Sequence, residues 1–315
     1  MKVDVSEIKS FKGCKRQWEL SSRNKFHLQP WVTPKAFAMG TLFHESLHAL
    51  YLGASLDKVM EMVKKEMDPE NDIALLAMIP GYAREVLPSD LETYNILDIE
   101  HQFHFQPFDR DGNVIPELAD LEVCGSIDMI ALDVLENKIY GFEHKTAKNF
   151  RDDSFLWMDD QPRVYTVALQ KWVDEYNAKM YKTWKDTCES IGDEGVYPPE
   201  PEPVTLGGIY INETKKLLKQ FQYKRTLCVY DPDDLMNYIQ AFFATCKELH
   251  SYVTENKYPE PCASYFGCPN CDFKTVCGTY QYKSLKKEEI LDEFEFEFKE
   301  RDHDHLEEKV ERNVR

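Results

Sequence analysis

The spacing of apolar side chains predicts a mainly helical first third of the chain. Apolar residues recur at near-helical intervals over residues 6–20, 34–52 and 55–94. Ser6 is the expected N-cap of the first helix, and Pro34 is placed to open the second. We expect the third stretch to break at Pro80-Gly81 and again at Pro88, because proline interrupts helical hydrogen bonding.

The pattern changes to strands after residue 95. Residues 96–108, 121–132 and 139–145 are rich in strand-forming side chains, and Glu136-Asn137-Lys138 between the last two is a turn sequence. We therefore expect residues 121–132 and 139–145 to pair as a β-hairpin.

Helices and strands alternate in the rest of the chain. We expect a helix over 154–176, a Pro-rich loop at 192–203, strands over 205–211 and 220–229, and a helix from Pro232 to His250 capped by Asp231. This order predicts an α/β domain with helical and Cys-rich additions.

Length and composition describe a folded protein of one large domain or two small ones. The 315 residues are 43% hydrophobic, and no apolar run approaches the ~20 residues that cross a bilayer. Residues 1–10 lack the apolar core of a signal peptide, so we expect a cytoplasmic protein. In that compartment the nine cysteines are expected to be thiols or metal ligands instead of disulfides.

The net charge of −18 argues against a nucleic-acid partner, but the charge is uneven. Residues 288–308 hold 11 acidic and two basic side chains, whereas residues 12–25 and 215–225 are locally basic. Each basic stretch fits a nucleic-acid groove or, equally well, the solvated face of an ordinary helix.

The predicted hairpin carries a set of residues suited to a hard cation. Side chains alternate along a strand, so Glu143 and Lys145 share one face while His144 points away. Asp128, in Gly125-Ser126-Ile127-Asp128, lies on the preceding strand. Two carboxylates and a lysine suit Mg²⁺, which usually takes one or two protein carboxylates. The simpler interpretation is a surface Glu–Lys pair, which is common and contributes little stability.

Polar residues on both sides of the hairpin extend this set. Gln161 and Tyr165 are four residues apart, which places them on one face of a predicted helix. His44 lies in the second predicted helix, with His48 nearby, where a histidine is most often an ordinary core or surface residue.

Taken in order, His44, Asp128 in a G-x-x-D setting, Glu143-x-Lys145 and Gln161-x3-Tyr165 resemble the RecB-like branch of the PD-(D/E)XK nuclease superfamily. The resemblance implies a restriction-endonuclease-like core, in which helices flank a central mixed sheet, with a helical insertion. One residue departs from the family name, because Ile127 stands where the "PD" proline would be.

The resemblance also implies a role for each matching residue. Asp128 and Glu143 would bind Mg²⁺ or Mn²⁺, with His44 and the backbone carbonyl of His144 as further ligands. Lys145 would position the attacking water and stabilise charge on the scissile phosphate. Gln161 and Tyr165 would orient the DNA strand.

The cysteines form a second candidate site. Cys268-x2-Cys271-x5-Cys277 is compact, and Cys14 lies near the N-terminus. The Cys-x2-Cys pair alone fits zinc, a redox pair or a cluster, and four cysteines also fit an iron–sulfur site. One cysteine before the core and three after it is similar to the iron–sulfur members of the same nuclease branch, which implies a 4Fe–4S cluster. Cys262 is the reserve ligand.

These observations predict four segments and one activity. We expect a helical region at 1–95, a nuclease core at 96–255, an iron–sulfur segment at 256–285 and an acidic, disordered or partner-bound tail at 286–315. The resemblance implies a metal-dependent DNA exonuclease acting on single strands or DNA ends in recombination, repair or CRISPR adaptation, with a partner protein from one of those pathways. The alternative is an iron–sulfur protein that binds DNA or a partner without cutting.

Overall fold

The computed structural model describes residues 1–31, 35–70, 72–191, 196–218, 220–262, 267–279, 286–295 and 297–300. The chain divides into two compact units, each assembled from separate stretches of sequence. Unit 1 comprises residues 1–34, 104–125 and 232–315, and unit 2 comprises residues 35–103 and 126–231. The four segments expected from the sequence are each continuous along the chain, unlike these units, and they stay a prediction.

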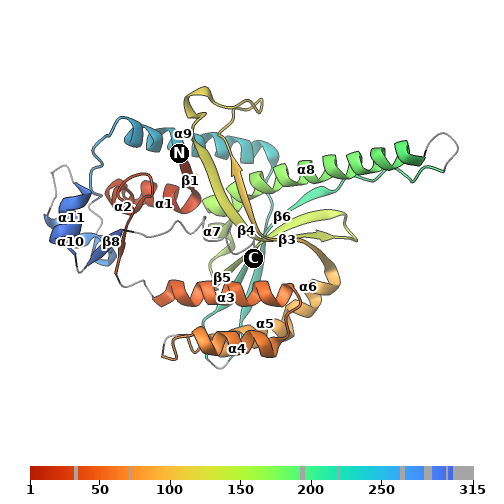
Figure 1. The fold of residues 1–315 in the computed structure, drawn as a ribbon, viewed down its shortest axis with the longest axis horizontal. Coiled ribbons are helices and arrows are strands. Elements are labelled where there is room, and N and C mark those ends of the chain that lie inside the picture. Colours follow the sequence, from red (N-terminus) through yellow and green to blue (C-terminus); the bar gives the residue numbers. More distant parts are fainter. Residues whose placement is uncertain are drawn as a thin grey trace. The chain divides into compact units, whose positions relative to one another are not determined.

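Unit 2 contains the expected hairpin and most of the helices around it (Figure 1). Its elements are α3 (Lys35–Tyr51), α4 (Leu56–Glu66), α5 (Leu75–Glu85), α6 (Leu87–Thr93), most of β3 (Tyr94–Phe105), most of β4 (Glu122–Asp133), β5 (Lys138–Ala147), α7 (Asp153–Met158), α8 (Asp160–Ile191), β6 (Thr205–Lys215) and β7 (Tyr223–Cys228).

The sheet is mixed, as predicted. Its strand order is β1-β4-β5-β6-β7, and β3 also pairs with β4. The hairpin is confirmed, because β4 and β5 are antiparallel with Met129 opposite Phe142. Strands β5 and β6 are parallel, and β6 and β7 are antiparallel. The short strand β1 (Lys2–Asp4) pairs in parallel with residues 122–124 of β4.

Helices cover β5 because its residues alternate between two apolar environments. Tyr140 and Phe142 belong to a buried cluster that also contains side chains of α3 and α5. Gly141 points the other way, where a Cβ atom would lie 2.7 Å from Ile209 and 3.3 Å from Leu169 of α8. Because glycine has no side chain, α8 can pack close to the strand at this position.

Unit 1 contains both cysteine-bearing regions. Its elements are β1, α1 (Val5–Gly13), α2 (Lys15–Ser21), β2 (Leu28–Pro30), the 3₁₀ turns η1 (Pro116–Leu118) and η2 (Cys268–Asn270), α9 (Pro232–Thr254), α10 (Lys274–Thr279), α11 (Lys287–Glu293) and β8 (Phe298–Glu300). A small buried cluster joins them, and Cys271 and Cys277 pack against it; its members are Leu20, Leu28, Phe273, Val276, Ile290 and Phe298.

The prediction of one helix over residues 6–20 was wrong. Asp4, not Ser6, caps α1, because its carboxylate accepts a hydrogen bond of 2.8 Å from the Glu7 amide. The helix then ends at Cys14, whose backbone is extended, and α2 starts at the next residue. The Cys14 sulfur accepts the Gln17 amide, so this cysteine caps the second helix.

Two other predicted boundaries also moved. Pro80 lies inside α5 and does not break it, because Met78, Ile79 and Tyr82 around it are buried and their packing offsets the proline penalty of about 3 kcal/mol. The helix predicted over 154–176 is two helices, α7 and α8. They are separated at Asp159, whose backbone is extended.

The start of the acidic tail forms regular structure, and the disordered or partner-bound character expected for residues 286–315 stays a prediction. Residues 287–293 form α11, and β8 pairs antiparallel with β2. Ile290 and Phe298 are buried in the unit 1 cluster, which explains why this acidic segment folds. Residues 301–315 lie outside the described part of the chain.

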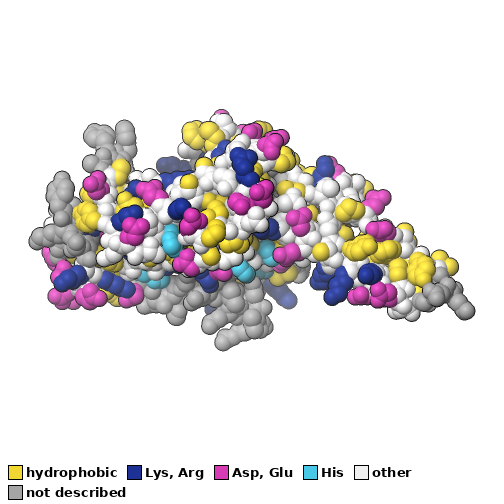
Figure 2. All heavy atoms as spheres, turned by 90° about the horizontal axis from the view of Figure 1, so that it is seen from above, with side chains coloured by type: hydrophobic (Ala, Val, Ile, Leu, Met, Phe, Trp, Pro, Cys, Tyr) yellow, Lys and Arg dark blue, Asp and Glu magenta, His cyan; other side chains and the backbone are white. Residues whose placement is uncertain are grey.

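None of the described helices is long and apolar enough to cross a bilayer. On the face seen in Figure 2, basic side chains are interspersed with acidic ones. The net charge is therefore not gathered into one patch on that face.

Candidate active site

Three metal-binding side chains meet in unit 2. Donor atoms of His44, Glu100 and Asp128 all lie within 4.8 Å of one another. One nitrogen and two carboxylate oxygens at this spacing suit a hard or borderline divalent cation. The structure therefore brings together two residues that the sequence predicted, His44 and Asp128, and adds one that it did not, Glu100.

Glu100 reaches the group through an unusual backbone conformation. It lies in β3, which pairs with β4, and its φ of 55° is in the left-handed region that few non-glycine residues adopt. The Ser126 hydroxyl donates a 3.2 Å hydrogen bond to its carboxylate. The available sequence signal was an acidic residue in a predicted strand, which is too common to single out Glu100.

Asp128 is tied to both neighbouring elements. Its Oδ2 accepts a 2.7 Å hydrogen bond from the backbone N–H of His144 on β5, and the same oxygen lies 3.4 Å from Nδ1 of His44 on α3. Burial by itself would raise the pKa of Asp128, but the adjacent His44, together with His144 and Lys145, outweighs burial and holds the pKa well below its usual range. Asp128 is therefore ionised.

Glu143 is held by two partners on one of its oxygens. Oε1 accepts a hydrogen bond from Lys145 and another, of 2.7 Å, from the side-chain amide of Gln161 on α8. Its other oxygen, Oε2, is buried without a hydrogen-bond partner among the described residues. Burial and the nearby charge of Asp128 raise the pKa of Glu143. Glu143 does not belong to the 4.8 Å group, but a buried and unpaired carboxylate oxygen is a donor suited to a cation.

Lys145 stays charged in this setting. Burial lowers the pKa of its ammonium, but the carboxylates of Glu143 and Asp128 outweigh burial and raise it. The side chain is one-third exposed, so its ammonium is also accessible to a bound molecule that enters from solvent. The predicted sharing of one strand face by Glu143 and Lys145 is confirmed by their ion pair.

The His144 ring points to the opposite side, as expected from strand alternation. Its centroid lies 6.0 Å from that of Tyr51 and 5.7 Å from that of Tyr82. Burial lowers its pKa to about 4, so the ring is neutral. The Asn212 amide nitrogen lies 3.4 Å from its Nδ1. The backbone carbonyl of His144 as a ligand stays a prediction.

A polar network on β7 and α6 holds the Asn212 side chain in place. Its Oδ1 accepts hydrogen bonds from the Tyr223 hydroxyl, at 2.8 Å, and from Arg225 Nε, at 2.9 Å. Arg225 in turn makes a bidentate pair with Asp90, at 2.7 and 2.8 Å. Such a pair fixes both partners in one geometry. The strand residues that carry the candidate site are therefore braced by β6, β7 and α6.

The two polar residues predicted on α8 have different surroundings. The Gln161 side-chain amide donates a 2.7 Å hydrogen bond to Glu143, and its predicted contact with DNA stays a prediction. Tyr165 is 8% exposed, and its ring packs edge-to-face on Phe103 at a centroid distance of 5.2 Å. Its predicted contact with DNA stays a prediction.

The basic stretch at residues 12–25 is largely engaged within unit 1. Arg16 is buried and pairs with Glu19 at 2.6 Å. Arg23 pairs with Asp4 at the same distance. These cations therefore stabilise the unit itself.

The basic stretch at residues 215–225 is similarly engaged within unit 2. Lys224 pairs with Asp153 at 2.6 Å, and Arg225 is committed to the buried Asp90. Among the described residues, neither stretch is a row of uncommitted cations.

The four predicted cluster cysteines gather in unit 1. Burial raises the pKa of Cys271, and it raises that of Cys277 to about 11; nearby Cys14 and Cys268 contribute in the same direction in both cases. Among the described residues, no three cysteine sulfurs lie within 4.8 Å of one another. Cys262 offers its carbonyl oxygen to Cys268, at 3.1 Å, and its own thiol is exposed.

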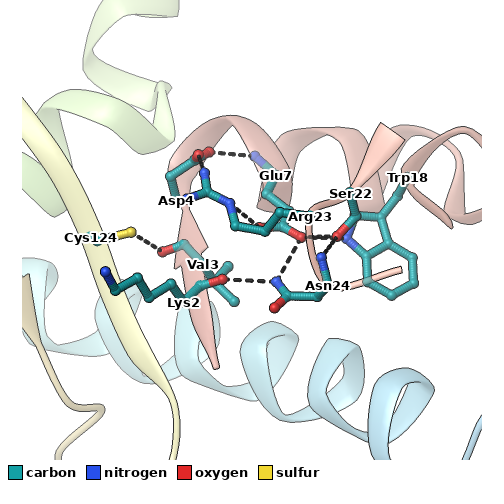
Figure 3. A network of polar contacts seen from close by, with 9 residues as sticks. All are labelled: Lys2, Val3, Asp4, Glu7, Trp18, Ser22, Arg23, Asn24 and Cys124. Carbon is teal, nitrogen blue, oxygen red and sulfur yellow. Dashed lines mark hydrogen bonds and ion pairs between the residues drawn. The ribbon is translucent and has the colours of Figure 1, made fainter. Parts of the chain in front are cut away.

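A buried carboxylate network surrounds the helices on either side of Cys14 (Figure 3). Glu7 on α1 accepts hydrogen bonds from Trp18 of α2, at 3.2 Å, and from Ser22 and Asn24 just after it. Arg23 is drawn into the same network by Asp4. These contacts hold α1 and α2 together at the turn that carries Cys14.

Comparisons with solved structures find distant likenesses. A Eubacterium rectale protein with the name "Putative exonuclease" shares 12% identity at a TM-score of 0.49, over 92% of each chain. A protein named SSO0001 shares 10% identity at a TM-score of 0.33, over 88% of this chain and 85% of that one. No curated protein matches the sequence.

The match to a protein family is more informative. Residues 3–278 match the family model described as the PD-(D/E)XK nuclease superfamily. The matched residues span most of the chain and include the hairpin with Asp128, Glu143 and Lys145. The protein belongs to the PD-(D/E)XK nuclease superfamily.

Proposed function

We propose that this nuclease is a Mg²⁺- or Mn²⁺-dependent DNA exonuclease of the RecB-like branch. The observation that carries the proposal is the meeting of His44, Glu100 and Asp128 beside the Glu143–Lys145 pair. Its substrates would be single-stranded DNA or DNA ends, in recombination, repair or CRISPR adaptation.

The donor set fits a divalent cation. His44, Glu100 and Asp128 would hold the ion, and the unpaired Oε2 of Glu143 would supply a further oxygen. A cation bound there supplies Lewis-acid stabilisation of the scissile phosphate and acidifies water. A nucleophilic side chain is not required for this chemistry.

The chain's own residues supply positioning and charge. Hydrolysis adds a water oxygen to phosphorus, breaks the phosphorus–oxygen bond to the neighbouring sugar, and returns a proton to the leaving oxygen. The Lys145 ammonium would stabilise the negative charge that grows on the phosphate oxygens. Gln161 keeps Glu143 in place while Lys145 contacts the substrate.

We further propose that Cys14, Cys268, Cys271 and Cys277 bind a 4Fe–4S cluster. The nearness of the four thiols supports a shared site, because Cys14 and Cys268 both act on the pKa values of Cys271 and Cys277. The cluster would join the N-terminal helices to the Cys-rich segment within unit 1.

The decisive experiment follows DNA strands labelled at either the 5′ or the 3′ end. With Mn²⁺ or Mg²⁺, we expect a single-stranded oligonucleotide to shorten progressively from one end, and EDTA to stop the reaction. Internal cuts on a circular single strand would show an endonuclease instead. Absence of cleavage with either metal, in protein that binds DNA, would favour the alternative of a non-cutting binding protein.

A further inference from the structure

Helix α7 exposes an apolar surface beside the candidate active site. Phe155, Trp157 and Met158 are 68%, 50% and 58% exposed, whereas Leu156 between them is buried. Single exposed apolar side chains are ordinary, but three large ones on little more than one helical turn are typical of a recognition surface. We call Phe155, Trp157 and Met158 the α7 ledge.

The backbone under the ledge is firmly anchored. Asp152 caps α7 by accepting the Ser154 amide at 2.9 Å. At the first residue of the helix, Asp153 pairs with Lys224 of β7. At its end, Arg163 Nε donates a 3.1 Å hydrogen bond to the Trp157 carbonyl. The ledge therefore presents its rings from a fixed position, which lowers the entropic cost of binding.

The ledge is continuous with the site. Asp159 joins α7 to α8, and its carboxylate accepts a 3.0 Å hydrogen bond from the backbone N–H of Gln161. The side chain of Gln161 then reaches Glu143 at 2.7 Å. Trp157 thus stands four residues before the side chain that positions the candidate catalytic carboxylate.

The charges around the ledge are compatible with a nucleic-acid strand. Two of the four carboxylates that flank the ledge are paired with cations, Asp153 with Lys224 and Asp159 with Arg151. On the site side, the one-third exposed Lys145 pairs with Glu143. A strand that enters the site therefore meets rings close in sequence to paired charges.

We propose that the α7 ledge stacks against unpaired nucleobases of the DNA strand that enters the site. The proposal deepens the proposed nuclease function, on which it rests, and names its substrate as DNA with unstacked bases. Every base has a flat apolar face, so aromatic side chains can bind a single strand without reading its sequence. In a duplex those faces are hidden by stacking, so the ledge would favour single strands.

The test compares two strands of equal charge. A fluorescein-labelled thymidine strand of about 15 nucleotides and an abasic strand of the same length are titrated in EDTA, which prevents cleavage. Wild-type protein should bind the base-bearing strand at least about tenfold more tightly than the abasic one. In the full-length double variant Phe155→Ala/Trp157→Ala, that ratio should fall toward one, with abasic binding unchanged.

Two further variants separate stacking from general damage. Trp157→Phe keeps a ring and should retain most of the preference for bases. Tyr181→Ala removes a half-exposed ring on α8 that lies twenty residues beyond Gln161, about 30 Å along the helix, and should leave the ratio at the wild-type value.

An unchanged ratio in the double variant would overturn the proposal, as would a wild-type protein that binds both strands equally. Conversion of a wild-type dimer to a monomer by the double variant, with the ratio unchanged, would instead identify the ledge as a contact between copies. These readouts do not require cleavage, so failure of the ledge leaves the nuclease assignment standing. A wild-type protein that neither binds nor cuts DNA would remove both.

Discussion

The backbone N–H of His144 donates a 2.7 Å hydrogen bond to the carboxylate of Asp128. This bond joins the two strands of the hairpin where the candidate site begins, and the same oxygen faces His44 at 3.4 Å. One carboxylate oxygen therefore ties β4, β5 and α3 together.

Asp128→Asn should separate metal binding from folding. The amide oxygen of asparagine can still accept the His144 N–H, so the melting temperature should change little. Loss of the negative charge should weaken Mn²⁺ binding by at least about 100-fold, measured by isothermal titration calorimetry, and abolish cleavage. Wild-type affinity for Mn²⁺ in this variant would exclude Asp128 as a ligand.

Glu100→Gln tests the candidate ligand that the sequence did not reveal. Removal of its charge should lower Mn²⁺ affinity by about 10- to 100-fold. Asp98→Asn is the matched control, because Asp98 lies two residues away on the same strand and pairs with His101 at 2.8 Å, outside the three-ligand group. Equal effects of the two substitutions would mean that Glu100 attracts the cation only through its negative charge, without binding it directly.

Lys145→Met should reduce catalysis without removing the metal. We expect single-turnover cleavage to slow by about 100-fold or more, because the charge on the phosphate loses its stabilising cation. Mn²⁺ affinity should stay near the wild-type value, since Lys145 is not a ligand. The exposed Lys148 offers a control, and Lys148→Met should cleave normally. Rapid cleavage by Lys145→Met would rule out the proposed role.

The proposed 4Fe–4S cluster should give the purified protein a brown colour and an absorbance band at about 400 nm. Cys277→Ser should lose iron and colour and melt at a lower temperature, because cluster binding is coupled to folding. Cys188→Ser, on α8 in unit 2, should keep the iron. Stoichiometric zinc in a colourless wild-type protein, measured by elemental analysis, would reject the cluster.

Glu7 should make stability depend on pH. Burial raises its pKa above the ordinary value of 4.5, so between these two values the folded state holds a proton that the unfolded state has released. The free energy of unfolding of the wild type, relative to Glu7→Gln, should therefore fall as pH rises through this window and stay constant below it. Glutamine can still accept the hydrogen bonds made to Oε1, which keeps the comparison fair.

Urea titrations of both proteins between about pH 4 and pH 8 measure this difference. Contributions from other carboxylates cancel in it. A difference that rises with pH would mean that Arg23 stabilises the charged form more than burial destabilises it.

The local pattern of residues was enough to determine much of the fold. Alternation along 121–132 and 139–145, with a turn between them, determined the hairpin, and with it the shared face of Glu143 and Lys145. These features depend on neighbours in sequence, so they are visible without coordinates. The order of the motifs likewise indicated the nuclease family that the match over residues 3–278 supports.

Only the tertiary structure decided which distant groups meet. Glu100 joins His44 and Asp128 through a backbone angle that no periodicity encodes, and Gln161 reaches Glu143 because α8 packs close over Gly141. Packing also kept α5 intact across Pro80 and ordered the start of the acidic tail. Burial energy and long-range contacts settle such outcomes, and they depend on partners that a local window of sequence does not contain.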